Sequence, residues 1–154
     1  GDWSSDVCSS DLLCMNQSLT TRRRSTGEAV QTSDQVLLGD TMGELLFLYA
    51  LADIAFVGGS LVPNGGHNLL EPAALGKPVL SGPHLFNFLE ISAQLRDAGA
   101  LREVQDADQL ADAVGELWRD SAAAQRMRDA GLGVLKANQG ALQRLLTGLA
   151  RLLG

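Results

Sequence analysis

The sequence predicts an α/β fold: a Rossmann-like parallel sheet with helices on both faces, followed by a helical C-terminal segment. Two observations predict it. Short, continuously apolar runs alternate along the chain with stretches of helical spacing, which is the pattern of βαβ units around a parallel sheet. The runs do not alternate polar and apolar residues, as expected of strands that are buried on both faces. With 154 residues, 45% of them hydrophobic, the chain is long enough for one domain of ordinary size.

Four apolar runs predict the strands, and each is followed by a helical stretch. The strands are expected at residues 35–39 (QVLLG), 53–59 (DIAFVGG), 78–82 (PVLSG) and 100–104 (ALREV). The helices are expected at residues 42–52, 68–76, 87–99 and 106–120, and from residue 121 onward. Gly76 and Gly99 mark helix ends, and Asp106 or Asp108 is expected to cap the helix that follows the fourth strand. Residues 35–154 thus form the predicted domain, with residues 106–154 as its helical C-terminal segment.

The first 34 residues do not fit this pattern. Residues 1–12 (GDWSSDVCSSDL) carry three acids, no base and no apolar period, so we expect them to be disordered. Codon by codon they are compatible with a translated sequencing-library adapter, which would make them non-native. Residues 13–34 are polar, with a run of three arginines at 22–24, and are interpreted as a connector or a damaged first strand.

Composition excludes several classes of function. The net charge is −6, whereas a nucleic-acid-binding domain needs a basic face. Cys8 and Cys14 have no partner at disulfide or metal-ligand spacing, which indicates a reducing compartment. No run approaches the ~18 apolar residues of a membrane span, so these residues are expected to be soluble. We also expect no bound metal, because no cluster of ligand residues is present in the sequence.

Three loops that follow the predicted strands carry the residues most typical of ligand binding. They read GDTMGE (39–44), GGSLVPNGGHNLLEP (58–72) and SGPHLFNF (81–88), and they contain both histidines of the chain. In open parallel sheets, ligands bind beyond the carboxyl ends of the strands. We therefore expect the three loops to form a site at one edge of one sheet.

The middle loop predicts a nucleotide site. The pairs Gly58–Gly59 and Gly65–Gly66 allow close approach of the backbone to a ligand. A helix that starts near Asn68 would offer free N–H groups and a positive dipole end to a phosphate. Glu71, one turn into that helix, can accept hydrogen bonds from vicinal hydroxyls such as those of ribose.

Each of these residues also has a simpler explanation. Glycines after parallel strands are common turn residues. Glu71 can serve as a first-turn acid favoured by the helix dipole, and His67 can be a cap or a surface residue. Asp40 can simply cap the following helix. Three unusual loops at one sheet edge favour the ligand site over these separate explanations.

The stretch GDTMGELLFLYALADIAFVGGSLVPNGGHNLLEPAALGKPVLSGPHLFNF (39–88) resembles the carboxyl-terminal half of the 3-deoxy-D-manno-octulosonic acid (Kdo) transferases of lipopolysaccharide synthesis. The combination of GGSLVPNGGHNLLEP with GPHLFNF is highly specific, and the resemblance extends from about Arg24 to NQGALQRLL near the end. It implies the C-terminal half of a two-domain glycosyltransferase of the B type (GT-B), in which this half binds the donor CMP-Kdo.

The resemblance also implies the reaction and its setting. Such an enzyme transfers Kdo from CMP-Kdo to a lipid A precursor with inversion, without a catalytic metal and without a cofactor, at the cytoplasmic face of the bacterial inner membrane. The general base, the lipid A precursor site and the membrane anchor are expected in an amino-terminal half that this sequence lacks. We therefore expect these residues alone to be inactive.

Residue roles are carried over from the same resemblance. Glu71 would hold the ribose, residues 58–60 would line the cleft floor, and residues 64–68 would face the CMP phosphate and the sugar carboxylate. Residues 41–43 would lie close to the cytosine or the phosphate. The predicted donor-binding residues are Thr41, Met42, Gly43, Gly58, Gly59, Ser60, Asn64, Gly65, Gly66, His67, Asn68 and Glu71, with Arg24, Glu44, Pro83 and Asn87 as additional candidates.

Two other functions remain open at this point. One is an enzyme of the same two-domain fold that resembles a nucleotide-sugar epimerase, which would need an acid–base pair across its cleft. The other is a stand-alone nucleotide-binding module, which would need no second domain.

Overall fold

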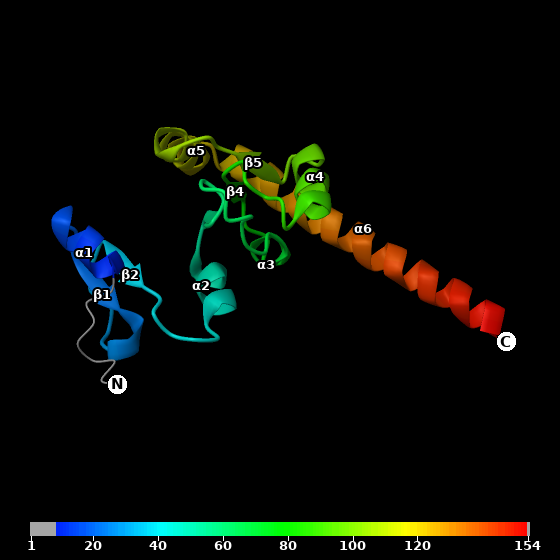
Figure 1. Ribbon diagram of the computed structural model, residues 1–154, viewed down its shortest axis with the longest axis horizontal. Helices are drawn as coiled ribbons and strands as arrows, with labels where there is room; N and C mark the ends of the chain where they lie inside the picture. The colour runs from blue at the N-terminus through cyan, green and yellow to red at the C-terminus, as the bar shows by residue number, and fades with distance from the viewer. Residues whose placement is uncertain (1–8, 154) are drawn as a thin grey trace. The chain divides into compact units, whose positions relative to one another are not determined.

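The computed structural model describes residues 9–153 (Figure 1). The chain divides into two units, residues 1–48 and 49–154, and each is described here by itself. Within the described residues, no helix is both long enough and apolar enough to cross a membrane.

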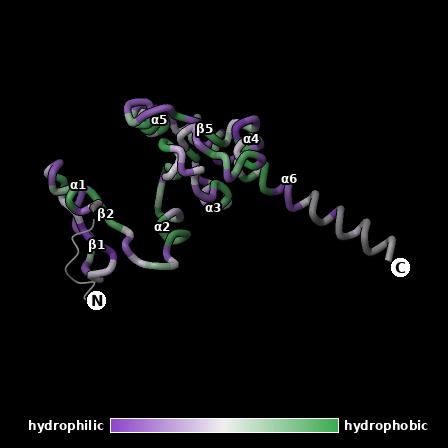
Figure 2. Tube along the Cα trace, viewed as in Figure 1, coloured by the Kyte–Doolittle hydropathy of each residue, from purple (hydrophilic) through white to green (hydrophobic). Residues whose placement is uncertain are grey.

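The first unit contains a small two-stranded sheet. Helix α1 (Ser9–Asn16) precedes strand β1 (Thr21–Arg23), a 3-10 turn η1 (Arg24–Thr26) and strand β2 (Val36–Leu38). Strands β1 and β2 pair in parallel, with Thr21 opposite Val36 and Arg23 opposite Leu38. Helix α2 (Leu45–Leu51) then leads into the second unit, and Figure 2 shows its predominantly hydrophobic sequence.

Two sequence expectations are wrong in this unit. The disorder expected for residues 1–12 does not hold for residues 9–12, which belong to α1; residues 1–8 lie outside the described part. Asp11 also forms an ion pair with Arg23, which ties α1 to β1. The strand predicted at 35–39 exists as β2, but it pairs with β1 and not with the main sheet. An apolar run predicts a strand without specifying its neighbour, because pairing depends on residues distant in sequence.

The second unit contains the predicted parallel sheet. Its strands β3 (Ala55–Val57), β4 (Val79–Ser81) and β5 (Leu101–Glu103) lie in the order β3-β4-β5. Its helices are α3 (Leu70–Ala74), α4 (Leu89–Asp97), α5 (Ala107–Arg119) and α6 (Ser121–Leu153). Asp106 caps α5 by accepting a hydrogen bond from the Gln109 N–H at 2.8 Å. The strand and helix positions agree with the sequence expectations to within about two residues.

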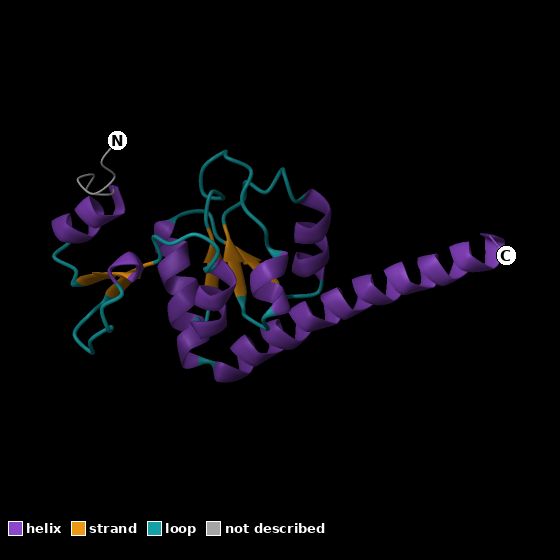
Figure 3. Ribbon diagram, turned by 90° about the horizontal axis from the view of Figure 1, so that it is seen from below, coloured by secondary structure: helices purple, strands orange, loops and turns teal. Residues whose placement is uncertain are grey.

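Helices cover both faces of this sheet, as Figure 3 shows. On one face, Val57 and Val79 pack with residues of α3, α4 and the middle of α6. On the other face, Leu80 packs with Leu117 of α5 and with the first turns of α6. The α/β fold class with helices on both faces is therefore confirmed.

Helix α6 passes along the amino ends of the strands. The Arg128 guanidinium donates to the backbone carbonyl of Asp53, just before β3, at 3.5 Å. Gly131 approaches Ala100, just before β5, so closely that a Cβ on Gly131 would lie 3.7 Å from the Ala100 Cβ. The βα loops of the sheet lie at the opposite, carboxyl ends of the strands.

Candidate functional site

A buried serine joins the first two strands at the carboxyl edge of the sheet. The register of β3 and β4 would place the Gly82 N–H against the Val57 carbonyl as the next ladder bond. Instead, the Ser60 hydroxyl is inserted between them: it donates to the Val57 carbonyl at 2.6 Å and accepts from the Gly82 N–H at 2.8 Å. Ser60 is fully buried, so both bonds are shielded from water.

The loops after β3 and β4 are held together by backbone hydrogen bonds. The His84 N–H donates to the Ser60 carbonyl at 2.9 Å, and the Gly66 N–H donates back to the Gly59 carbonyl at 2.9 Å. The Asn87 N–H reaches the Gly65 carbonyl at 3.4 Å. Two of the three predicted loops therefore form one connected rim of the sheet.

Most glycines of this rim are required by the fold itself. Gly59, Gly65 and Gly66 adopt φ of 69°, 89° and 74°, in the left-handed region that favours glycine. Gly82 has a different reason: a Cβ there would lie 2.2 Å from the Ser60 carbonyl oxygen. These glycines therefore carry no information about a ligand by themselves.

Gly58 differs from its neighbours. Its φ is not positive, and a Cβ built on it would have no atom of the described residues within 4 Å. Neither its conformation nor packing among the described residues explains a glycine at this position. The open space beside the end of β3 is therefore available to a ligand.

Helix α3 differs from the expected phosphate-binding helix. It starts at Leu70 rather than near Asn68 and is five residues long, too short for a full helix dipole. The Asn68 side-chain oxygen already accepts from the Leu70 N–H at 3.0 Å. Any phosphate recognition here must depend on the loop backbone and on side chains.

Glu71 lies near the only tyrosine of the chain. Burial raises the pKa of the Tyr49 phenol, and the neighbouring Glu71 carboxylate raises it further. Glu71 itself is partly exposed and forms no ion pair within the described residues. Its carboxylate therefore retains the capacity to accept hydrogen bonds from hydroxyls.

The predicted residues of this rim fall into two groups by exposure. Ser60, Gly65 and Gly66 are buried, and the Ser60 hydroxyl is engaged in its bonds to Val57 and Gly82. The accessible group consists of Gly58, Gly59, Asn64, His67, Asn68, Glu71, Pro83 and Asn87. The imidazole of His67 lies against Gly59, where a Cβ would approach its Nε2 to 3.1 Å.

The third loop, residues 39–44, belongs to the first unit. Arg24 forms a fork with Glu44, through Nε to Oε2 at 3.1 Å and Nη2 to Oε1 at 3.0 Å. The Thr41 hydroxyl donates to the same carboxylate, and the Arg24 guanidinium lies 5.7 Å from the centroid of the Phe47 ring. The structure thus brings Arg24, Thr41 and Glu44 together through direct contacts.

Ion pairs and hydrogen bonds set the charges of this loop. The Arg24 fork, followed by the Thr41 hydroxyl, lowers the pKa of Glu44. The hydroxyl and the N–H of Ser25 lower the pKa of Asp40, so Asp40 holds the 3-10 turn rather than capping α2. Met42 is 97% exposed, and Gly43 adopts φ of 79°.

Sequence reasoning missed Gly82 as a determinant of the site. It lies in the predicted loop 81–88, but only the structure shows that its missing side chain admits the Ser60 backbone. The dipeptide Ser-Gly at the end of an apolar run was the available signal.

A parallel sheet with helices on both faces and glycine-rich loops at its carboxyl edge defines a Rossmann-like α/β domain. The chain belongs to the group 1 glycosyl transferases, because residues 20–133 match the model of that family.

Two relatives define the type of glycosyl transferase more closely. The chain is 51% identical over 125 residues to the 3-deoxy-D-manno-octulosonic acid transferase of Haemophilus influenzae, and 39% identical over 149 residues to that of Bordetella pertussis. These matches cover 80% and 97% of the chain but only 29% and 35% of the two relatives. The chain therefore spans about a third of the length of these transferases.

A solved structure matches as well. The crystal structure of the C-terminal CMP-Kdo binding domain of WaaA from Acinetobacter baumannii superposes with a TM-score of 0.78 at 42% identity. The match covers 80% of the chain and 65% of that structure. The resemblance to Kdo transferases inferred from the sequence is confirmed, and the epimerase-like alternative is not favoured.

Proposed function

We propose that this chain is the donor-binding part of a Kdo transferase, which transfers Kdo from CMP-Kdo to a lipid A precursor. The observation that carries the proposal is the likeness to a solved CMP-Kdo binding domain, in fold and at 42% sequence identity. The open space at Gly58, on the edge where parallel sheets bind nucleotides, supports it independently.

The accessible residues of the rim have the chemistry that CMP requires. Glu71 accepts hydrogen bonds from the ribose hydroxyls. The backbone beside Gly58, together with Asn64, His67 and Asn68, lies against the phosphate and the sugar. In this proposal, donors in that loop stabilise the negative charge that develops on departing CMP, without a metal ion.

The resemblance to Kdo transferases also assigns donor contacts to the loop of the first unit. Thr41, Met42 and Gly43 contact the cytosine or the phosphate, and the fork between Arg24 and Glu44 holds their loop in shape. Pro83 and Asn87 border the site from the loop after β4. The general base, the acceptor site and the attachment to the inner membrane belong to an amino-terminal domain of the full transferase.

Replacing Glu71 tests the proposal through the sugar of the nucleotide. Calorimetric titration is expected to show that the chain binds CMP more tightly than 2′-deoxy-CMP. Glu71→Ala should remove that preference and weaken the binding of CMP by about 1–3 kcal/mol, because one strong hydrogen-bond acceptor for the ribose hydroxyls is lost. Glu116→Ala, an exposed carboxylate on α5 that pairs with Arg102, serves as the matched control. Equal affinity for the two nucleotides in the unmodified chain would contradict the ribose role.

A further inference from the structure

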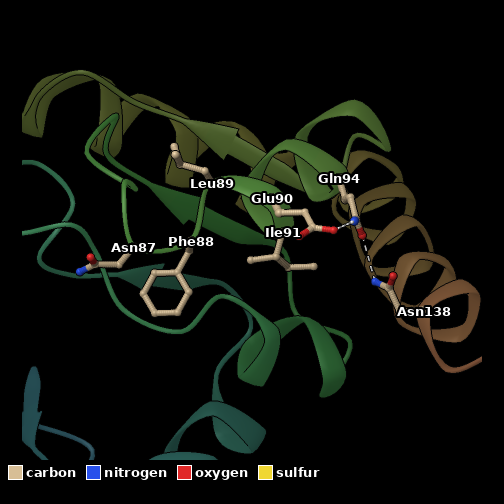
Figure 4. Close-up of a pocket in the computed structure, with 7 residues that line it drawn as sticks. All are labelled: Asn87, Phe88, Leu89, Glu90, Ile91, Gln94 and Asn138. Atoms are coloured by element: carbon tan, nitrogen blue, oxygen red, sulfur yellow. Dashed lines mark hydrogen bonds between the residues drawn. The ribbon is translucent and has the colours of Figure 1, made fainter. Parts of the chain in front are cut away.

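A second hollow lies beside the donor loops and shares only Asn87 with the proposed CMP site. It is an open hollow bordered by the end of the loop after β4, helix α4 and helix α6, and its volume is about 330 Å³ (Figure 4). That is at the lower end of the ~300–1,000 Å³ range of small-molecule sites. Its lining residues are Asn87, Phe88, Leu89, Glu90, Ile91, Gln94 and Asn138.

A directed chain of hydrogen bonds crosses this hollow. The Asn138 side-chain N–H of α6 donates to Gln94 Oε1 at 3.0 Å, and the Gln94 side-chain N–H donates to Glu90 Oε1 at 3.4 Å. Figure 4 shows the three side chains in line, with the carboxylate at one end. Within the described residues, Glu90 Oε2 and Asn138 Oδ1 accept no hydrogen bond, so both ends offer acceptors to a ligand.

The charge of the hollow selects among ligands. Within the described residues, no lysine or arginine lies within ion-pair distance of Glu90. An uncompensated carboxylate repels phosphates and sugar acids but accepts hydrogen bonds from hydroxyl groups. The hollow therefore disfavours anionic ligands and suits a ligand with hydroxyl donors.

Apolar side chains complete the lining. The Phe88 ring and Ile91 are partly buried against the core and border the same hollow, and Leu89 is 67% exposed beside them. A ring with hydroxyls at its rim and C–H groups on its faces can contact both kinds of wall. Pyranoses have this amphipathic form.

We propose that the hollow between α4 and α6 is a second carbohydrate subsite, for a neutral polyhydroxylated ring distinct from the acidic sugar of the donor. Asn87 connects it to the donor rim: its N–H bonds to the Gly65 carbonyl, and its carboxamide lies against Gly65.

The test is a nuclear magnetic resonance titration of the chain with N-acetylglucosamine and, separately, with the acidic sugar N-acetylneuraminic acid. The neutral sugar should shift the side-chain amide signals of Gln94 and Asn138 and saturate with a Kd of about 1–10 mM, as expected for so small a ligand. The acidic sugar should leave both signals in place.

Three variants separate binding from folding. Gln94→Ala should lower the affinity for the neutral sugar about fivefold, as expected for the loss of one hydrogen bond. Gln125 is a glutamine of α6 whose amide donates to Asp129 at 2.9 Å, and Gln125→Ala should leave the affinity for the neutral sugar unchanged. Glu90→Gln keeps the size of the side chain but removes the charge, so it should let the acidic sugar bind.

Three outcomes would overturn the proposal: no saturable shift, equal shifts from the acidic sugar with the unmodified chain, or an unchanged affinity in Gln94→Ala. CMP added to the same sample reports on the donor rim through the Gly58 and Gly59 amides. An absence of sugar binding in the hollow can thereby be distinguished from an absence of CMP binding at the donor rim.

Discussion

Replacing Ser60 with alanine probes the hydroxyl that joins β3 to β4 under the proposed donor site. The substitution removes a bond of 2.6 Å to the Val57 carbonyl and a bond of 2.8 Å from the Gly82 N–H. Each buried group left without a partner costs about 1–3 kcal/mol. Movement of Gly82 toward Val57 would recover part of this, so we expect a loss of about 2–4 kcal/mol in the free energy of unfolding.

Urea unfolding followed by circular dichroism measures this loss. The midpoint should fall by about 1–3 M at constant m, given the m-values of small proteins. Ser92→Ala is the matched control, because Ser92 is equally buried but its hydroxyl only donates to a carbonyl of its own helix, at 3.0 Å. The control should cost less than about 1 kcal/mol. A Ser60→Ala midpoint as high as that of Ser92→Ala would refute the bridging role.

Three further predictions follow from the structure. Gly82→Ala should destabilise by about 1–3 kcal/mol or more, measured in the same urea assay, because its Cβ would overlap backbone. The Tyr49 phenol, followed by ultraviolet absorbance, should titrate above the ordinary tyrosine pKa of about 10. Glu71→Gln should lower the pKa of Tyr49 but not return it to the ordinary value, because burial is the larger cause of the shift. A raised folded pKa also means that stability falls as the pH rises past about 10. Arg24 lowers the pKa of Glu44 in the folded state, so this ion pair stabilises the first unit above pH ~4.3. That stabilisation is lost as the pH falls through the pKa that Glu44 has in the folded state. Glu44→Gln should therefore flatten the acid unfolding transition measured by circular dichroism.

Much of the second unit could be predicted from the sequence because its signals are local. A continuous apolar run predicts a buried strand, as at β3 and β4, and Gly99 with φ of 77° ends its helix as a local stop signal should. Asp106 likewise caps α5 through its own side chain. Such features depend on neighbours within a few residues, which a single sequence displays.

The remaining features depend on contacts between distant residues. The pairing of β2 with β1 requires knowing which strand lies beside it. The place of the Ser60 hydroxyl in the ladder requires the approach of Gly82, 22 residues away. The hydrogen bonds from Asn138 through Gln94 to Glu90 join α6 to α4, and Asn138 and Gln94 are 44 residues apart in the sequence. Sequence spacing alone predicts none of these.

The central claim is that the rim of loops at the carboxyl edge of the β3-β4-β5 sheet binds CMP. The most direct measurement is a titration of the chain with CMP, followed by backbone amide shifts, on the unmodified protein and on Gly58→Ala. We predict saturable shifts concentrated in residues 58–71 and a markedly weaker affinity in the variant, whose stability should be unchanged because its Cβ enters open space. Gly133→Ala, which also adds a Cβ into open space but on α6, should bind CMP normally. Shifts that fall elsewhere, or a Gly58→Ala variant that binds CMP as tightly as the unmodified chain, would contradict the claim.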